Sequence, residues 1–209
     1  MTRIELPHQD HYDVALRNEA RTLSERFDPE RLAALGVEVK DGRRVELPVL
    51  CWRFAVETEP FAMSLVPGGG RPAVVWQILV LDYLNAAHPR RPTGFRSFAD
   101  FAGARTYLSV YGVRVNERLA RTMGADAEQL ARAAERCGGV RGTQEPLSYL
   151  FRFFPLLELQ VVRHRGDEDF PASCTVLLSD NAPDVLTLEC MVVAAERLVA
   201  SLRGKTPCE

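Results

Sequence analysis

The sequence lacks any apolar segment long enough to cross a bilayer. Its longest apolar runs, "AVVW" and "ILVL" on either side of Gln77, fall far short of the roughly 20 residues that a transmembrane helix needs. The N-terminal stretch "MTRIELPHQDHYDV" has no apolar core and no small-residue cleavage site, so a classical secretion signal is not expected. We therefore expect a soluble, cytoplasmic protein.

The chain also lacks a strong net charge. Its formal charge is −2, which gives no overall field that would attract nucleic acid or an anionic membrane. Apolar residues make up 46% and charged residues 26% of the 209 positions, an ordinary globular composition with enough apolar surface for a core. We expect neither nucleic acid nor a membrane among its partners.

Clustered cysteines are missing as well. The five cysteines are odd in number and scattered, with no CxxC pair among them. Zinc sites, iron–sulfur clusters and disulfide frameworks all need several cysteines brought together. We expect no cluster held by this chain alone, and most of these residues are expected to be small buried hydrophobes: Cys51, Cys137, Cys174, Cys190 and Cys208.

Catalytic and nucleotide-binding motifs are absent too. There is no HExxH motif and no nucleophile elbow. The glycines of "PGGGRP" precede a helical pattern, but no GxxxxGK[ST] follows, and Pro72 removes one backbone donor that a phosphate site would use. This stretch is predicted to be a flexible connection.

What the sequence does contain is a regular alternation of helix and strand patterns. We expect a single domain over residues 1–209, because no repeat, low-complexity tract or long linker divides it. Its parts are predicted as helices followed by a small β-meander over residues 10–70, a helical middle over residues 72–138, and a β-hairpin followed by a C-terminal helix over residues 147–203.

Apolar spacing locates the individual elements. Helical spacing is predicted from Asp10 to Phe27, in "DPERLAALG", from about Arg105 to Met123, after Asp126, and from about Thr187 to Leu202. Period-two alternation in "RRVELPVLCWRFAVETEPFAMSLV" predicts short strands divided by Pro48 and Pro60. "LSYLFRFF", "LLELQVVRH" and "FPASCTVLL" are predicted to be later strands.

The segment "AVVWQILVLDYLNAAH" is apolar on nearly every side, which is typical of a helix buried over most of its circumference. The predicted fold class is therefore α+β: antiparallel strands from the N- and C-terminal thirds pack with a central, mostly buried helix.

The main candidate site is the acidic turn "GDEDF" between the last two strands. It offers Asp167, Glu168 and Asp169, with His164 upstream and Asp180 expected across the hairpin. Paired carboxylates can share acid–base work, and oxygen ligands with an imidazole can hold a divalent cation. The alternative is a hairpin turn whose like charges are screened by water, since Gly and Asp are favoured turn residues.

Three further features carry weaker hypotheses. Arg114, Arg118 and Arg121 recur on one predicted helix face, which suits either an anionic ligand or partner or a solvated surface. The neighbouring carboxylates are expected to raise the pKa of the Cys174 thiol, which argues against a reactive thiolate. The aromatic positions are more typical of a core than of a stacking platform: Tyr149, Phe151, Phe153, Trp52 and Phe54.

Several phrases, in their order along the chain, resemble an uncharacterised family known as domain of unknown function 3786. They are "WQILVLDYLNAA", "PTGFRSFADFAGARTY", "CGGVRG", "FRFFPLLELQVV", "GDEDFPASCTVLLSDNAPDVLTLEC" and "AAERLVASL". The resemblance covers most of the chain from Tyr12 onward. Similar domains occur alone and fused to four-iron iron–sulfur domains in anaerobes, near one-carbon and corrinoid metabolism.

What the resemblance implies is an accessory role beside an iron–sulfur or corrinoid protein. The chain has no cysteine cluster of its own, so any cluster would lie on the partner; a corrinoid or another tetrapyrrole is the cofactor class that this implies. The leading hypothesis is a non-catalytic binding or accessory protein. Two alternatives stay open: a metal-assisted or acid–base enzyme using His164 and the acidic turn, and a structural subunit of a larger complex.

Overall fold

The computed structural model describes residues 7–209 except for residues 41, 88, 144 and 145. Within that part of the chain it confirms the α+β class, with seven α-helices and two antiparallel sheets. The helices are α1 (Pro7–Glu25), α2 (Pro29–Ala34), α3 (Val74–Leu84), α4 (Leu108–Tyr111), α5 (Ala127–Arg136), α6 (Ala182–Val185) and α7 (Leu188–Leu202). The strands are β1 (Glu38–Val39), β2 (Arg44–Val49), β3 (Trp52–Thr58), β4 (Phe61–Val66), β5 (Phe95–Ser97), β6 (Val140–Arg141), β7 (Leu147–Phe154), β8 (Leu157–His164) and β9 (Ser173–Ser179).

The N-terminal sheet is the predicted meander, in the order β1-β2-β3-β4. Its apolar face is set by alternation, with Leu47 opposite Phe54 in the register of β2 and β3. Pro48 does not divide the strands as predicted, because it lies inside β2 opposite Arg53. The proline is tolerated there because β1 pairs only with Val45 and Glu46, so no neighbour needs its missing N–H.

The outer edge of β4 is closed by the glycine-rich turn that follows it. The N–H of Leu65 donates to the carbonyl of Gly70 at 2.8 Å, and the N–H of Gly69 donates to the carbonyl of Leu65 at 2.9 Å. Gly68 and Gly69 have φ angles of 117° and 68°, which glycine adopts without steric cost. "PGGGRP" is thus a hydrogen-bonded turn that covers a strand edge rather than the predicted flexible connection.

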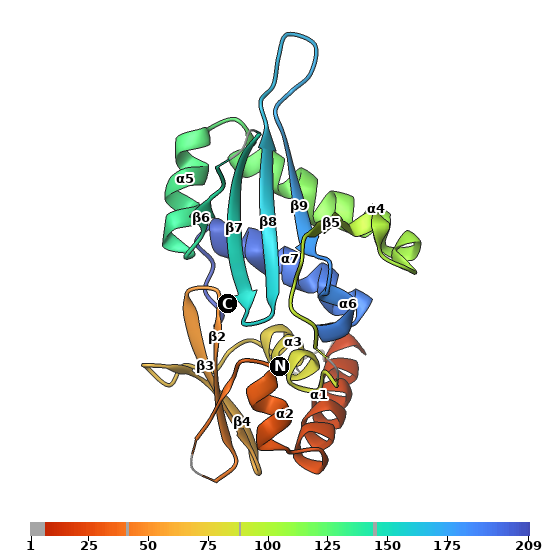
Figure 1. The fold of residues 1–209 in the computed structure, drawn as a ribbon, viewed down its shortest axis with the longest axis vertical. Coiled ribbons are helices and arrows are strands. Elements are labelled where there is room, and N and C mark those ends of the chain that lie inside the picture. The colour runs from red at the N-terminus through yellow and green to blue at the C-terminus, as the bar shows by residue number, and fades with distance from the viewer. Residues whose placement is uncertain (1–6, 41, 88, 144–145) are drawn as a thin grey trace, which may run out of the picture.

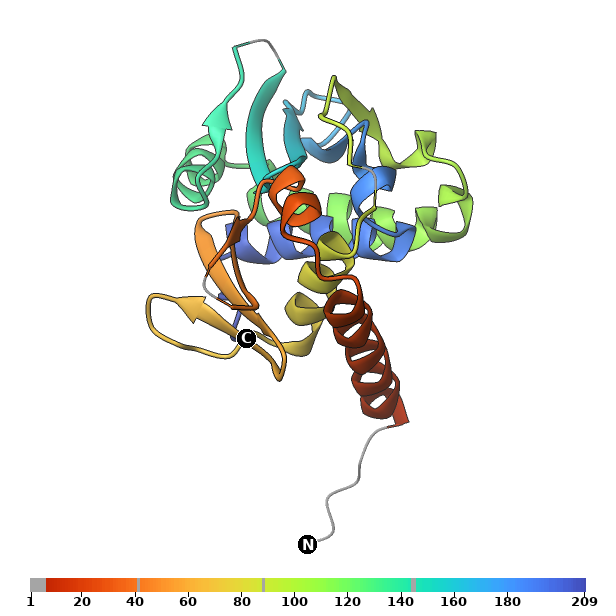
Figure 2. The ribbon, with the colours of Figure 1, turned by 60° about the horizontal axis from the view of Figure 1, so that its bottom comes forward.

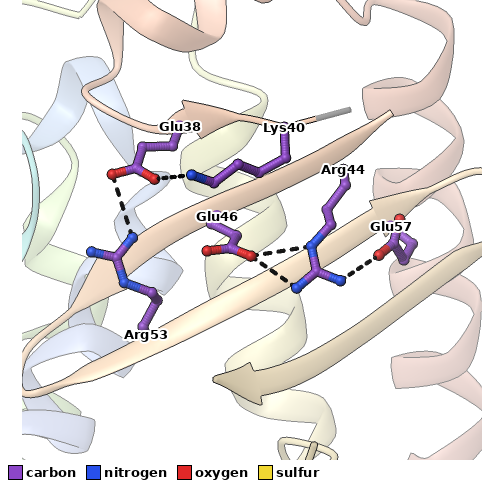
Figure 3. Close-up of polar contacts among 6 residues, drawn as sticks. All are labelled: Glu38, Lys40, Arg44, Glu46, Arg53 and Glu57. Carbon is purple, nitrogen blue, oxygen red and sulfur yellow. Dashed lines mark hydrogen bonds and ion pairs between the residues drawn. The ribbon is translucent and has the colours of Figure 1, made fainter. Parts of the chain in front are cut away.

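The outer face of this sheet carries a balanced ion-pair network (Figure 3). Arg44 contacts Glu46 at 2.8 Å and Glu57 at 3.0 Å. Glu38 contacts Lys40 at 2.7 Å and Arg53 at 3.6 Å. Three carboxylates face three cations, so the surface has no excess of one charge, and exposed pairs of this kind add little to stability because water screens them.

The C-terminal sheet has the order β5-β9-β8-β7-β6. The predicted hairpin formed by β8 and β9 is confirmed, and its tip extends beyond the rest of the molecule (Figure 1). Strand β5 pairs with β9 only as far as Leu177. At Val176, side chains instead of a neighbouring strand form hydrogen bonds with the backbone of β9. The carbonyl of Val176 accepts the Tyr111 hydroxyl at 2.8 Å, and its N–H donates to Asn116 Oδ1 at 3.0 Å.

Those two side chains belong to an irregular helical run over residues 104–124. The sequence predicts one continuous helix from about Arg105 to Met123, but π-type turns at Gly112–Glu117 and Ala120–Gly124 interrupt it. A π-type turn contains more residues than an α-helical turn, because its hydrogen bonds join residues five apart. Both segments pack on β9. The predicted helix over this region is therefore confirmed only in part.

The predicted central helix is confirmed as α3, and it contacts both sheets through aromatic side chains. Trp76 lies 5.9 Å from Trp52 of the first sheet in an edge-on arrangement. It also stacks on Phe153 of the second sheet at 5.9 Å, with an interplanar angle of 7°. Tyr83 stacks on Phe154 at 4.3 Å. These rings form one continuous apolar core between the two sheets.

Hydrogen bonds fix the same junction. The Tyr83 hydroxyl donates to the carbonyl of Leu35 at 2.6 Å and accepts the N–H of Leu156 at 3.1 Å. It thereby joins the end of α2 to the turn between β7 and β8. Gly36, with φ of 76°, lies so close to Pro155 that an added Cβ would come within 2.6 Å of the ring. Only glycine fits this approach.

Helices α2 and α7 begin at the residues that the sequence indicates. Asp28 accepts the N–H of Glu30 at 2.9 Å at the start of α2, and Thr187 caps α7. Figure 2 shows α1 lying alongside α3, where it buries Leu16 and Leu23. Among the described residues, no helix combines the length and the apolar character that a membrane span requires.

Candidate functional site

The acidic turn forms the tip of the β8–β9 hairpin. Its base is tied to the body by Arg163, whose Nε donates to the carbonyl of Gly124 at 2.7 Å. Beyond the last paired residues, His164 and Ser173, the chain leaves the sheet and closes a loop over residues 165–172. The tip is therefore a projection supported by a two-stranded stem (Figure 1).

Asp167 organises this loop from within. Its Oδ1 accepts the N–H groups of Asp169 at 3.0 Å and Phe170 at 2.7 Å. Its own N–H donates to the carbonyl of Phe170 at 2.9 Å. A carboxylate that satisfies backbone donors two and three residues ahead is the Asx type of turn. Asp167, a predicted ligand-binding residue, thus stabilises the conformation of the turn.

Gly166 allows the two arms of the loop to meet. A Cβ at this position would lie 2.5 Å from the backbone nitrogen of Ala172 and 3.0 Å from the carbonyl oxygen of Phe170. Both neighbours are backbone atoms, which cannot rotate aside as a side chain can. The sequence "GDEDFP" therefore encodes a defined turn rather than a loose connection.

The turn displays Phe170, whose residue surface is 72% exposed. Glu168 and Asp169 are exposed next to it, and no ion pair to either appears among the described residues. A large aromatic side chain normally gains about 1.5–3 kcal/mol from burial. Its exposure on an ordered projection, beside carboxylates, is the feature that sequence reasoning missed.

The predicted members of the site are only partly brought together. His164 is exposed at the end of β8, at the base of the loop that carries Asp167, Glu168 and Asp169. Asp180 lies at the opposite end of β9, a seven-residue strand that spans roughly 23 Å at about 3.3 Å per residue. The structure therefore separates Asp180 from the acidic turn.

Asp180 is instead a structural carboxylate. It accepts the N–H of Thr93 at 2.8 Å, the Thr93 hydroxyl at 2.6 Å and the N–H of Gly94 at 3.3 Å. These hydrogen bonds, chiefly from the Thr93 hydroxyl, lower the pKa of Asp180 to about 2. Its negative charge holds the strand-entry loop before β5 against the end of β9.

The predicted arginine patch lies on the irregular helical run. Arg114, Arg118 and Arg121 are all exposed there. Arg114 contacts Glu196 of α7 at 3.5 Å, which neutralises part of the patch. The patch stays a prediction as an anion or partner site.

A groove of about 690 Å³ lies at the base of the hairpin. Arg141, Arg163 and Arg165 line it together with Asp126 and Glu128. Asp126 caps α5 by accepting the N–H groups of Glu128 at 2.8 Å and Gln129 at 3.0 Å, and these bonds lower its pKa. The groove contains none of the predicted carboxylates of the acidic turn.

A smaller pocket of about 220 Å³ lies between α1, α3 and α7. Its polar centre is Asp82, which accepts the N–H of Thr187 at 2.8 Å and the Thr187 hydroxyl at 3.1 Å. Burial raises the pKa of Asp82 and, together with the Asp82 charge, that of the Cys190 thiol. Asp82 and Thr187 are engaged in hydrogen bonds at the start of α7. The raised pKa makes the Cys190 thiol unreactive.

Two other expectations are resolved by burial. Four of the five aromatic residues are buried in the hydrophobic core, and Trp52 packs half-buried against it, so the core interpretation is confirmed. Burial, rather than the neighbouring carboxylates, raises the pKa of Cys174 to about 11. The direction expected from the sequence is thus right and the cause is different.

No group of three or more His, Cys, Asp or Glu side chains that could hold a metal ion is present in the described part of the chain. The tip carboxylates are exposed, and Asp167 accepts backbone donors of its own loop. Chemically, this arrangement can recognise a surface.

Comparison with known proteins adds family information. The family described as domain of unknown function (DUF3786) matches residues 28–201, which include both sheets and the hairpin tip. Neither the curated proteins nor the solved structures contain a significant match.

Proposed function

This chain belongs to the DUF3786 family of domains of unknown function, and we propose that it is a non-catalytic accessory protein that docks on a partner protein through the tip of its β8–β9 hairpin. The single observation that carries the proposal is the 72% exposed Phe170 on an ordered acidic projection. Exposed aromatic anchors that fill a pocket on the partner dominate many protein interfaces.

The fixed shape of the tip supports this role. Because Asp167 already holds the N–H groups of Asp169 and Phe170, the loop loses little conformational freedom on binding. Ordering a mobile loop and its side chains would cost about 0.5–1.5 kcal/mol for each immobilised side chain. Preorganisation removes part of that cost.

The charge of the tip defines the partner surface. Asp167, Glu168 and Asp169 directly precede Phe170 and give the tip negative charge. The complementary surface is an apolar pocket rimmed by lysine or arginine, which would steer the encounter and select against acidic surfaces. We expect association to weaken as salt increases, because the rim charges are exposed and screened.

We further propose that the partner is an iron–sulfur or corrinoid protein. This part rests on the family resemblance and on the absence of a cysteine cluster in the sequence, which leaves any cluster to the partner. The contacts at the tip support docking without selecting the cofactor. The two parts are therefore tested separately.

The experiment is recovery of partners from a native extract prepared without air, with the tagged full-length chain as bait. Three baits are compared by quantitative mass spectrometry: the wild type, Phe170→Ala, and the matched control Val113→Ala. Val113 is also exposed and apolar, at 49%, but lies on the helical run and not in the hairpin loop. A specific partner is expected with the wild type and the control and lost with Phe170→Ala.

The ultraviolet–visible spectrum of the recovered complex tests the partner class. Absorption of an iron–sulfur cluster or a corrinoid supports it, whereas a colourless complex that depends on Phe170 contradicts the partner class and leaves docking intact. Equal recovery with all three baits contradicts docking through the tip. A complex of fixed stoichiometry in crude extract would favour the structural-subunit alternative.

A further inference from the structure

Two cysteines that are far apart in the sequence meet at the junction between the sheets. Cys51 lies in the tight turn between β2 and β3, and Cys137 directly follows α5. Both are free thiols, and their side chains share a hydrogen bond. The scattered positions of the five cysteines give no indication of this pair.

The surrounding backbone fixes the approach of the two side chains. The N–H of Leu50 donates to the carbonyl of Phe153 at 3.0 Å, which anchors the turn that carries Cys51 to β7. Gly139 packs against Phe151 so closely that an added Cβ would lie 2.5 Å from the ring. The turn and the end of α5 are thus held at positions two residues apart on the same strand.

The two thiols differ in exposure. Cys51 is exposed and lines an open groove of about 450 Å³ together with Trp52 and Arg53. Cys137 is buried, with only 4% of its surface exposed, and lies at the C-terminus of α5. A small molecule in the groove reaches Cys51 first.

The two thiols also differ in pKa. The hydrogen bond from Cys137 lowers the pKa of Cys51 to about 7. The same bond and burial raise the pKa of Cys137, and the negative end of the α5 dipole also disfavours a thiolate there. Cys51 is therefore the nucleophile of the pair and Cys137 the resolving thiol.

We propose that Cys51 and Cys137 form a dithiol–disulfide exchange site whose substrates are low-molecular-weight disulfides. The Cys51 thiolate attacks the sulfur–sulfur bond of the small disulfide, forms a mixed disulfide and releases one thiolate, which takes a proton from solvent. Cys137 then loses its proton to solvent and attacks the Cys51 sulfur. This forms the Cys51–Cys137 bond and releases the second thiolate, which is also protonated.

The electrons balance in this sequence. The two protein thiols lose two electrons in total, and the small disulfide gains them and becomes two thiols. In the reverse direction an added dithiol regenerates the reduced pair. The new bond would link the β2–β3 turn of the first sheet to the end of α5 beside the second sheet.

The other cysteines provide internal controls. Burial raises the pKa of both Cys174 and Cys190, so neither competes at neutral pH. Cys208 is exposed and is the one remaining thiol that a small disulfide can reach among the described cysteines. Its removal is expected to leave the exchange at Cys51 unchanged.

The test uses the reduced full-length chain and oxidised glutathione, without air, followed by acid quenching, alkylation and mass spectrometry. The variants are Cys51→Ser, Cys137→Ser and the control Cys208→Ser. The wild type and the control are expected to give a peptide cross-linked between Cys51 and Cys137, reversible by dithiothreitol. Cys137→Ser is expected to stop at one glutathione on Cys51, and Cys51→Ser to leave Cys137 unmodified.

Other products overturn the proposal. They are a stable glutathione adduct on Cys51 of the wild type without the cross-link, reaction at Cys208 alone, or oxidation of Cys137 at the wild-type rate in Cys51→Ser. Because a buried hydroxyl can destabilise the fold, Cys137→Ala is made in parallel, and near-ultraviolet circular dichroism confirms that each variant is folded. A folded Cys137→Ala in which Cys51 does not accumulate as the mixed disulfide with one glutathione also contradicts the assignment.

Discussion

The Oδ1 atom of Asp167 accepts the backbone N–H of Phe170 at 2.7 Å, so a carboxylate of the acidic turn fixes the position of the exposed aromatic residue beside it. The carboxylate of Asp167 and the ring of Phe170 are therefore structurally coupled. If the carboxylate were free to bind an ion, the loop would lose its principal internal acceptor.

Replacement of Asp167 with Ala is predicted to loosen the tip without weakening the fold. Two backbone N–H groups, those of Asp169 and Phe170, lose their acceptor, and the loop lies beyond the paired strands. Hydrogen exchange should accelerate at these amides, while the free energy of unfolding changes by no more than about 0.5 kcal/mol, as for ordinary surface substitutions. Unchanged exchange at both amides would contradict the Asx turn.

Replacement of Phe153 with Ala is predicted to destabilise the junction between the sheets. The ring is fully buried and stacks on Trp76, and such a truncation costs about 3–5 kcal/mol. For a chain of this size each kcal/mol lowers Tm by about 2–4 °C. The loss is measured by urea unfolding followed through tryptophan fluorescence, with Phe170→Ala as the control that should leave stability unchanged.

Replacement of Asp180 with Asn is predicted to reduce stability at neutral pH but not in strong acid. The pKa of Asp180 is about 2 in the fold, below its ordinary value of 3.8, so the native state binds fewer protons than the unfolded state between these values. The contribution of the carboxylate is therefore complete above the ordinary pKa and disappears as the pH falls through about 2. Urea unfolding at several pH values should show the gap to the wild type closing over that range.

Replacement of Cys137 with Ala is predicted to slow alkylation of Cys51 at pH 7. Loss of the hydrogen bond returns the pKa of Cys51 from about 7 toward its ordinary value of 9.0, although nearby Arg53 and Arg136 remain. The thiolate fraction falls by about fifty-fold, but the more basic thiolate is a better nucleophile, so a net decrease of roughly five- to tenfold is expected. Iodoacetamide labelling across a pH series measures both the rate and the pKa.

A rate equal to that of the wild type would show that Cys137 does not lower the pKa of Cys51. Mass spectrometry of the labelled peptide is needed as a control, because Cys208 is also exposed and consumes reagent.

Local patterns were sufficient for much of the fold. The all-round apolar segment of α3 indicated a buried helix, and alternating positions such as Leu47 and Phe54 indicated a half-buried strand. Two- and three-residue strands such as β5 and β6 are too short to show a period, and they exist only because a longer neighbour pairs with them.

The functional features depend more strongly on tertiary structure. A turn at Gly166 and Asp167 follows from residue preferences, whereas the outward display of Phe170 depends on how the loop closes. The sequence suggests that Asp180 lies near the turn because hairpin arms lie side by side, but the length of β9 places it at the other end. The Cys51–Cys137 pair arises where both segments contact β7, a relationship that no local pattern contains.

The most direct test of docking through the hairpin tip is the apparent Kd of the recovered partner for the wild type, Phe170→Ala and Val113→Ala, measured by titration at matched ionic strength. Loss of an aromatic anchor is predicted to cost at least about 2 kcal/mol, a weakening of roughly thirtyfold, while Val113→Ala stays close to the wild type. Equal affinities for the wild type and Phe170→Ala would contradict the account.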